Sequence, residues 1–252
     1  MESLRKPFEG VSNIVKFNWH FYVISIVLCL FIYFVGLWFN FPVLSTVIII
    51  LIGLGVFISL LVSYYVYDVS NLYSLDWLKE KEVTKPTSIL NIHAGFDEIS
   101  AIIQFKYPTS KLKVVDFYNP QKHTEVSIER ARKSAPAYPQ TKQVETTNMP
   151  FEDESYDIIF VFLSAHEIRN KSERILFLKE LKRGLKDNGE IHVTEHLRDL
   201  PNFLAFNFGF FHFHSRKTWL SDFESADLAI SSQIKITPFL STFKLKKNGN
   251  LS

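Results

Sequence analysis

Two long uncharged runs near the start of the chain are the feature that most restricts how it can fold. Trp19–Phe39 and Val43–Tyr67 are apolar and contain no Lys, Arg, Asp or Glu. A helix needs roughly 20 residues to cross the hydrocarbon core of a bilayer, and each run is long enough to do so. Because only Asn40, Phe41 and Pro42 separate the runs, we expect a tight hairpin of two transmembrane helices. The alternative is a buried hairpin in the core of a soluble protein.

The residues around these runs give the expected anchor an orientation. Basic residues precede and follow the hairpin, and the connecting turn has none; they are Arg5, Lys6, Lys16, Lys79, Lys81 and Lys85. The positive-inside rule therefore predicts two spans, with both termini and the following domain on the cytoplasmic side of the membrane. A secretory signal peptide fits poorly, because the first run lacks a small-residue cleavage site and a second span follows at once. The predicted organisation is a membrane anchor over 1–67, with spans at about 19–39 and 43–67, a juxtamembrane linker over 68–85 and a folded domain over 86–252.

The folded domain begins with a strand, a glycine turn, a helix and a second strand. Ser88–Ile92 is a short apolar run, typical of a strand buried on both faces. Gly95 supplies backbone freedom in the turn that follows, and Asp97 stands where the N-cap of a helix belongs. The second strand, Leu112–Val115, ends on Asp116. This layout, with an acid about 20 residues after the glycine, predicts nucleoside binding at the carboxyl edge of a parallel sheet.

The same stretch resembles the first two motifs of class I methyltransferases that use S-adenosylmethionine. That family has an acid followed by x-Gly-x-Gly-x-Gly, and then a second acid that ends the next strand. The chain keeps the middle glycine as Gly95 and the second acid as Asp116. It departs from the pattern at Asn91, which replaces the first acid, and at His93 and Asp97, which replace the flanking glycines.

A later segment carries the resemblance further. Residues 148–162, NMPFEDESYDIIFVF, are similar to the family's segment in which Leu-Pro-Phe, an acidic turn and Phe-Asp lead into the fourth strand. In that family an acid a few residues before the proline contacts the adenine amino group, and Glu145 matches its position. A carboxylate accepts hydrogen bonds but donates none, which suits an amino group. The resemblance implies cofactor contacts from Asn91, His93, Gly95, Asp116, Phe117, Glu145 and Ser164.

The remaining pattern predicts the rest of an α/β domain. We expect helices over 120–133, 172–185 and 215–226, a third strand at 143–145, a turn at 186–189 and a fifth strand at 190–194. Two strands, 231–237 and 240–246, close the sheet. The resemblance implies a Rossmann-like methyltransferase sheet, with parallel strands and a closing antiparallel strand, preceded by the transmembrane hairpin.

Two His-Glu pairs follow predicted strands and are candidates for catalysis. His166 and Glu167 follow the fourth strand, and Glu195 and His196 follow the fifth, so both pairs face the crevice at the strands' carboxyl ends. An oxygen acceptor must lose its proton, and histidine, with an ordinary pKa near 6.5, is the natural base at neutral pH. We predict His166 as the first candidate and His196 as the second, with Glu167 beside them; a structural role is the alternative for either histidine.

The sequence does not predict a metal site at these pairs. His166 and Glu167 are adjacent rather than four residues apart on one helix face. His192 and Glu195 fall on opposite faces of a strand. The single cysteine, Cys29, lies in the first apolar run, which excludes a disulfide framework and a thiolate metal site.

Charge and aromatic content restrict the classes of molecule that the chain is expected to bind. The net charge of +2 is too small to favour a nucleic acid. Asp97 at a helix N-terminus would repel the pyrophosphate of a dinucleotide, whereas S-adenosylmethionine carries no phosphate. Leu200–Trp219 holds six phenylalanines, which predicts either an apolar substrate pocket or contact with the bilayer.

The resemblance and the anchor together imply an enzyme. It would be a membrane-anchored methyltransferase that moves a methyl group from S-adenosylmethionine to an apolar or aromatic, lipid-like acceptor. The alternatives are a non-catalytic, membrane-tethered binding or assembly module with the same fold, and a dinucleotide-dependent dehydrogenase. The acceptor atom and the oligomeric state stay open.

Overall fold

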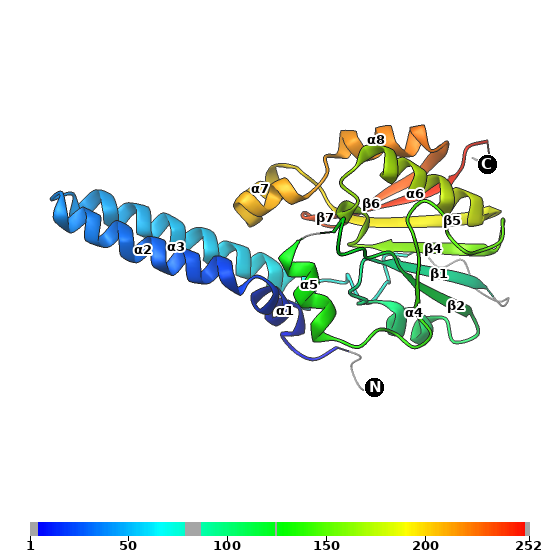
Figure 1. Ribbon diagram of the computed structural model, residues 1–252, viewed down its shortest axis with the longest axis horizontal. Helices are drawn as coiled ribbons and strands as arrows, with labels where there is room; N and C mark the ends of the chain where they lie inside the picture. Colours follow the sequence, from blue (N-terminus) through cyan, green and yellow to red (C-terminus); the bar gives the residue numbers. More distant parts are fainter. Residues whose placement is uncertain (1–4, 79–86, 124, 250–252) are drawn as a thin grey trace.

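The computed structural model describes residues 5–78, 87–123 and 125–249. Two long helices form an arm that projects from an α/β domain (Figure 1). These helices are α2 (Trp19–Trp38) and α3 (Pro42–Tyr64). A short helix, α1 (Glu9–Phe17), precedes them and lies at the base of the arm.

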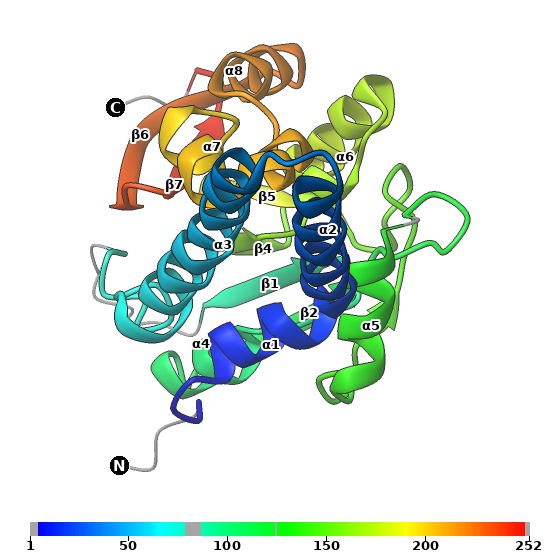
Figure 2. The same ribbon diagram turned by 90° about the vertical axis from the view of Figure 1, so that its left-hand side faces the viewer.

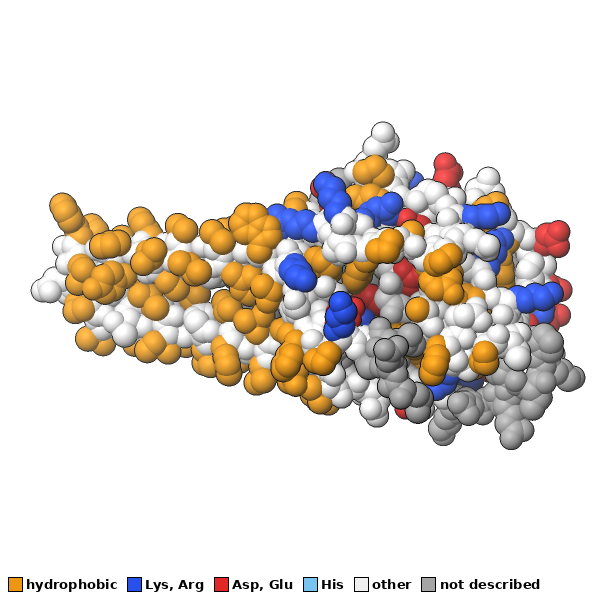
Figure 3. Space-filling view, turned by 90° about the horizontal axis from the view of Figure 1, so that it is seen from below, with side chains coloured by type: hydrophobic (Ala, Val, Ile, Leu, Met, Phe, Trp, Pro, Cys, Tyr) orange, Lys and Arg blue, Asp and Glu red, His pale blue; other side chains and the backbone are white. Residues whose placement is uncertain are grey.

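The arm is a tight hairpin, as the sequence predicts. Asn40 takes a positive φ of 57° in the turn, and Pro42 starts α3, where its missing N–H costs no hydrogen bond. Gly36 is needed near the turn, because a Cβ at this position would collide with the side chain of Ser45. Both helices are long and apolar enough to cross a membrane. In each helix only 6% of the most apolar 18-residue stretch is buried. Hydrophobic side chains cover the arm along its length, and Lys and Arg side chains gather where it joins the domain (Figure 3).

The domain is built on a sheet of seven strands in the order β3-β2-β1-β4-β5-β7-β6. The strands are β1 (Ser88–His93), β2 (Lys111–Asp116), β3 (Lys142–Gln143), β4 (Tyr156–Phe162), β5 (Leu185–His196), β6 (Leu228–Thr237) and β7 (Leu240–Lys247). The first five run parallel, whereas β7 is antiparallel to both β5 and β6. This order confirms the predicted Rossmann-like sheet with its closing antiparallel strands.

Helices and one irregular segment bury the two faces of the sheet. The remaining helices are α4 (Ser100–Lys106), α5 (Val126–Ser134), η2 (Ala165–Glu167), α6 (Lys171–Gly184), α7 (Leu200–Phe206), η3 (Asn207–His212) and α8 (Arg216–Ser225). One face packs against α6 and α8 through residues such as Phe177 and Trp219. The other face packs against α4 and against the segment between α3 and β1.

The segment after α3 is part of the domain rather than a solvated connection. It continues α3 as the π-helical turn η1 (Tyr65–Val69), and Val66, Leu72 and Leu75 are fully buried against the sheet. Asp68 accepts hydrogen bonds of 2.8 Å from the backbone N–H groups of Gly10 and Val11, so it caps the first turn of α1. The rest of the predicted linker, including Lys79, Lys81 and Lys85, lies outside the described residues.

Local differences from the sequence prediction have physical causes. Helix α5 begins later than predicted, because Asn119 and His123 close a turn through two hydrogen bonds of 2.8 Å. The predicted turn at 186–189 belongs to β5, where the pairing with β4 shifts register between Tyr156 and Ile158. The third strand ends at Gln143, before Glu145.

A buried ion pair between α6 and α8 gives a test of the packing. Arg174 Nε donates a 2.6 Å hydrogen bond to Asp222 Oδ2, and neither side chain exposes more than 3% of its surface. Asp222→Ala should lower the free energy of unfolding by about 3–5 kcal/mol, because it leaves a buried guanidinium without its carboxylate. Equilibrium urea unfolding of the detergent-solubilised chain measures this loss.

The matched control breaks an exposed pair on α5, Glu129 with Lys133. Glu129→Ala should leave the same free energy almost unchanged, because solvent screens an exposed ion pair. Equal losses for the two variants would contradict the assigned role of the α6–α8 contact.

Candidate functional site

The carboxyl ends of β1, β2, β4 and β5 meet at one edge of the sheet, beside the base of the hairpin. Register pairs His93 with Asp116 and Phe162 with Thr194, so these strands end close together. Figure 2, viewed along the hairpin, shows the sheet behind α2 and α3. A parallel sheet binds its ligands outside this edge.

The turn after β1 has the conformation that only glycine adopts readily. Gly95 has a φ of +91°. A Cβ on Gly95 would collide with the side chain of Arg132, which reaches over the turn from α5. Arg132 Nη1 donates to Asp116 Oδ2, and its guanidinium lies 4.5 Å from the centroid of the Tyr118 ring. Arg132 therefore covers the turn and pairs with the acid that ends β2.

Buried polar atoms around this turn lack partners within the described part of the chain. They are Asn91 Oδ1, His93 Nε2 and Asp97 Oδ2. Asn91 Nδ2 donates to Ser100 Oγ at 2.8 Å, and Asp97 Oδ1 accepts from the backbone N–H of Ser100 at 3.0 Å. Burial lowers the pKa of His93. These three polar atoms around one turn are available to hydrogen bonds from a polar ligand or from water.

The structure brings some predicted cofactor residues together and separates others. Gly95, Asp116 and Ser164 lie at the same edge, where Ser164 Oγ donates to Ile92 O at 3.3 Å. The Phe117 ring is buried in the core, 5.4 Å from the Phe177 ring centroid. Glu145 is exposed beyond the end of β3. The cofactor contacts predicted for these residues stay predictions.

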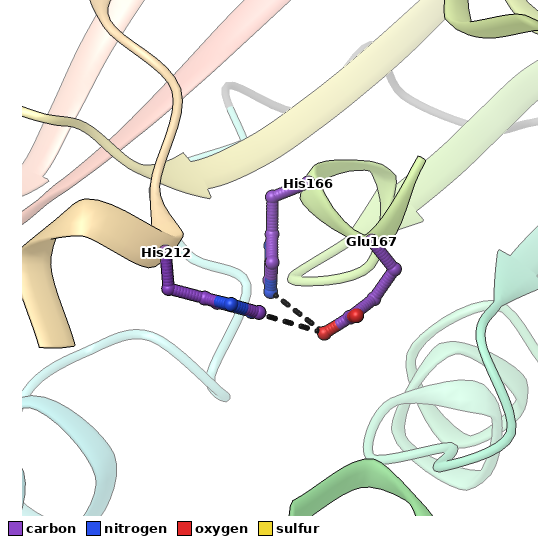
Figure 4. A group of neighbouring side chains, drawn as sticks. All are labelled: His166, Glu167 and His212. Atoms are coloured by element: carbon purple, nitrogen blue, oxygen red, sulfur yellow. Dashed lines mark hydrogen bonds and ion pairs between the residues drawn. The ribbon is translucent and has the colours of Figure 1, made fainter. Parts of the chain in front are cut away.

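A cluster of histidines and carboxylates lies at the ends of β4 and β5 (Figure 4). His166 Nδ1 lies 2.5 Å from Glu195 Oε2, and the backbone N–H of His166 donates to Glu195 Oε1 at 3.2 Å. Glu167 Oε1 lies 3.3 Å from His166 Nε2 and 3.1 Å from Nε2 of His212, which comes from η3. Glu125 Oε1 lies 3.3 Å from His212 Nδ1.

Charge controls the protonation of this cluster. Burial opposes the charged form of His166, but Glu195 and Glu167 outweigh it and raise the pKa of His166 to about 10. Burial likewise opposes charge on Glu167, yet hydrogen bonds from His166 and His212 hold the pKa of that carboxyl well below its usual range. His166 thus holds a proton at neutral pH when no other cation is near. Its predicted role as a base stays a prediction.

The second predicted base, His196, ties the hairpin to the sheet. Its Nδ1 donates to the backbone oxygen of Phe239 at 2.9 Å, so Nε2 accepts the 2.7 Å hydrogen bond from the Tyr67 hydroxyl. Burial lowers the pKa of His196 to about 4, and the nearby His166 and His212 lower it as well. Both ring nitrogens of His196 are therefore used in hydrogen bonds within the protein. This agrees with a structural role, the alternative given for this histidine in the sequence analysis.

Sequence reasoning missed several residues of this edge. Glu125 directly precedes α5, Arg132 lies in α5 and His212 ends η3. All three are separated along the chain from the strand ends that they meet. Tyr67 was assigned only to a membrane span. The one available signal was the density of histidine in the aromatic stretch that contains His212.

That aromatic stretch forms α7 and η3, which lie beside α3 (Figures 1 and 2). Asn207 approaches Gly55 in the middle of α3. Large apolar side chains of α7 and η3 remain exposed next to the hairpin; they are Leu200, Phe203, Leu204, Phe208 and Phe211. The His-Glu cluster contains the last residue of η3, so it adjoins this apolar surface.

Part of the chain matches a known family. Residues 118–193 match the methyltransferase domain family. A search of curated proteins found no match. Solved structures include a Pyrococcus horikoshii OT3 protein at 14% identity and a TM-score of 0.51, with 71% of this chain and 90% of that chain covered.

Two further structures are similar over most of the domain. A SAM-dependent methyltransferase from Methanosarcina mazei is 16% identical, with a TM-score of 0.50 and 69% of this chain and 95% of that chain covered. An O-methyltransferase family 2 protein from Planctomyces limnophilus, solved in complex with apigenin, is 15% identical, with a TM-score of 0.51. That match covers 77% of this chain and 61% of the other. At these identities the likeness is one of fold.

The pKa of His196 predicts how the tie between hairpin and sheet responds to acid. The pKa is about 4 in the folded chain and about 6.5 when unfolded. The unfolded chain therefore binds more protons between these values, and stability falls as the pH drops from 6.5 towards 4. Between pH 7 and pH 5 this residue should remove about 2 kcal/mol from the free energy of unfolding.

Unfolding of the wild type and of His196→Gln at both pH values isolates this contribution. Glutamine cannot titrate, so the variant should lose about 2 kcal/mol less than the wild type over the same interval. An identical pH dependence in the two proteins would show that His196 is not held neutral.

Proposed function

We propose that this chain, which carries a methyltransferase domain with the class I fold, transfers a methyl group from S-adenosylmethionine to an apolar, lipid-like acceptor at a membrane. The observation that carries the proposal is the position of the exposed aromatic surface of α7 and η3. It lies between the side of the hairpin and the polar carboxyl edge of the sheet. An acceptor with an apolar body and one reactive oxygen fits such a boundary.

The residues at the carboxyl edge suit this cofactor. Asp116 ends β2, where a carboxylate would accept hydrogen bonds from the ribose hydroxyls. The Gly95 turn allows the backbone to approach a ligand closely, and Asp97 Oδ2 is a buried acceptor without a partner. When bound, S-adenosylmethionine supplies an activated methyl group on a sulfonium, so the protein mainly positions the acceptor and excludes water. Arg132 must release Asp116 for the cofactor to bind.

The apolar surface of the hairpin supports membrane anchoring. Both helices present apolar side chains on every side, and the domain covers almost none of them. Gly55, which meets η3 at Asn207, lies about 13 Å along α3 from Tyr64. If α3 spans the bilayer, α7 and η3 lie beside its inner half, since the hydrocarbon core is about 30 Å thick. A lipid acceptor would then reach the site from within the leaflet.

Contacts at the foot of the hairpin support a cytoplasmic domain. Arg130 of α5 donates to the backbone oxygen of Phe17 at 2.8 Å and lies 5.1 Å from the centroid of the Trp19 ring. A cation and an indole at the foot of α2 are the side chains that favour the membrane–water interface. With Lys16 in α1, they support the cytoplasmic orientation that brings the domain to its cofactor.

We assign the acceptor side of the site to the His-Glu cluster. His166 has 8% of its surface exposed and adjoins η3, whereas His196 is committed to Tyr67 and Phe239. If the acceptor atom is oxygen, its proton is therefore proposed to leave at His166 and Glu167, and His166 must first give up the proton that it holds at neutral pH. His196 is proposed to position the base of the hairpin.

A non-catalytic binding module is the second candidate. The contact that favours it is the pairing of Arg132 with Asp116 over Gly95, which fills the space above the glycine turn. In such a module Arg132 would keep its place and S-adenosylmethionine would not bind.

Methyl transfer into lipid tests the function directly. Purified chain, tritiated S-adenosylmethionine and a total lipid extract should yield labelled lipid, and His166→Ala should reduce the rate by roughly 10²–10⁴. The control, Glu173→Gln, alters a carboxylate of α6 outside the cluster and should leave the rate unchanged. No label from the wild type with any lipid fraction would reject the proposed acceptor class.

A pair of variants at the cofactor end tests the assignment of Asp116. Asp116→Ala should weaken S-adenosylmethionine binding at least about tenfold, because two charge-assisted hydrogen bonds are lost. Arg132→Ala should not weaken it, since Arg132 competes with the ribose for the same carboxylate. Equilibrium dialysis with labelled cofactor measures both. Unchanged affinity in Asp116→Ala would remove β2 from the cofactor site.

A further inference from the structure

We propose that His166, Glu167 and His212 form a binding site for one divalent transition-metal cation, with Zn²⁺ the best match, on the acceptor side of the cluster. The cation's role in catalysis rests on the proposed function, whereas its binding does not. Imidazole nitrogens and a carboxylate oxygen are a ligand set that suits Zn²⁺ and Fe²⁺ rather than Mg²⁺ or Ca²⁺.

Two of the three distances between the ligand atoms match a single small cation, and the third, between the two histidine nitrogens, lies within 4.8 Å. Glu167 Oε1 lies 3.3 Å from His166 Nε2 and 3.1 Å from His212 Nε2, and all three atoms lie within 4.8 Å of one another. Zn²⁺ bonds to N and O at about 2.0–2.2 Å, which places neighbouring ligands of a tetrahedron about 3.3–3.5 Å apart. Three protein ligands leave a fourth position open. Figure 4 shows the three side chains pointing toward one another from η2 and η3.

Each histidine is also held in the way that ligating histidines are held. His166 Nδ1 faces Glu195 Oε2 at 2.5 Å, and His212 Nδ1 faces Glu125 Oε1 at 3.3 Å. A carboxylate that accepts the Nδ1 proton leaves the Nε2 lone pair free to bind a metal. In the structure the Arg169 guanidinium donates to His212 Nδ1. His212 Nδ1 can therefore donate to Glu125 only after Arg169 turns toward Glu125 Oε1, which lies 3.8 Å from its Nη2.

The charge balance of the cluster favours a divalent cation. The carboxylates of Glu125, Glu167 and Glu195 contact the two imidazoles, and Arg169 is the guanidinium that joins them. His166 carries a proton when no cation is bound. Once the imidazoles give up their protons to bind a cation, three negative charges face the one positive charge of Arg169, and a divalent cation compensates the remaining two. Glu195 is fully buried, so this imbalance is costly without a cation.

Residue spacing alone predicts no metal site here, because His166 and Glu167 are adjacent rather than four residues apart on one helix face. In η2 the two side chains converge on a third ligand that comes from 45 residues further along the chain. This arrangement depends on η3 lying against the end of β4, which residue spacing does not reveal.

The open position gives the cation a role in the proposed reaction. With the cation bound, His166 is a ligand instead of the base. A hydroxyl acceptor in the open position gives its proton to a base in solution more readily, because the cation stabilises the oxyanion. The oxygen then bonds to the methyl carbon as the carbon–sulfur bond breaks. The electron pair of that bond returns to sulfur, and the sulfonium becomes a neutral thioether.

Calorimetric titration with Zn²⁺ tests the site without cofactor or acceptor. The full-length, detergent-solubilised chain, free of a polyhistidine tag and treated with chelator, should bind one equivalent of Zn²⁺ and none of Mg²⁺. Glu167→Gln and His212→Gln should each weaken binding at least about a hundredfold, and Glu125→Gln by about tenfold. The control Glu173→Gln should bind as the wild type does. Co²⁺ in place of Zn²⁺ should give visible absorption that is lost in His212→Gln.

The outcomes distinguish failure of the metal site from failure of the proposed methyl transfer. Absence of saturable binding of one equivalent, or equal affinity in the wild type and both ligand variants, would overturn the metal site. Zn²⁺ should also raise the midpoint of thermal unfolding of the wild type but not of Glu167→Gln, which keeps the test valid if a variant is less stable. One-equivalent binding without any methyl transfer would leave the metal site standing and reject the proposed function.

Discussion

Burial of the segment that follows α3 is the constraint on which the rest of the structure depends. Helix α4 has only seven residues, so it cannot cover its face of the sheet alone. Val66, Leu72 and Leu75 complete that cover, and burying side chains of this kind stabilises the fold by about 1.5–3 kcal/mol each. The base of the hairpin is thus one layer of the domain. The Tyr67–His196 hydrogen bond fixes it to the end of β5.

This attachment determines what lies around the carboxyl edge of the sheet. Because the hairpin leaves the domain at that edge, α1 and α5 pack beside the glycine turn, where Phe17 meets Phe96 edge to face. On the side of the hairpin away from α1 and α5, α7 packs against α3. The adjoining η3 brings His212 to the end of β4. One edge therefore joins the polar glycine turn, a cluster of ionisable groups and an apolar surface.

The sequence predicted the features that depend on local pattern. The runs at Ser88–Ile92 and Leu112–Val115 are strands, and Gly95 and Asp116 fall where their spacing indicates. Contacts between distant segments were not predictable from pattern. Arg132 pairs with Asp116 only because α5 lies across the edge, and His212 joins His166 only because η3 packs there. The expected third-strand position of Glu145 failed for a related reason, since β3 pairs with β2 over two residues and then ends.

The central claim is that the Gly95–Asp116 edge holds S-adenosylmethionine rather than a dinucleotide. Asp97 Oδ1 already accepts from the first backbone N–H groups of α4, the groups that a pyrophosphate would need. Isothermal titration of the solubilised chain with S-adenosylmethionine and, separately, with NAD compares the two ligands directly. Saturable, one-to-one binding of S-adenosylmethionine without heat from NAD is the result that this site predicts. Binding of NAD, or of neither ligand, would contradict it.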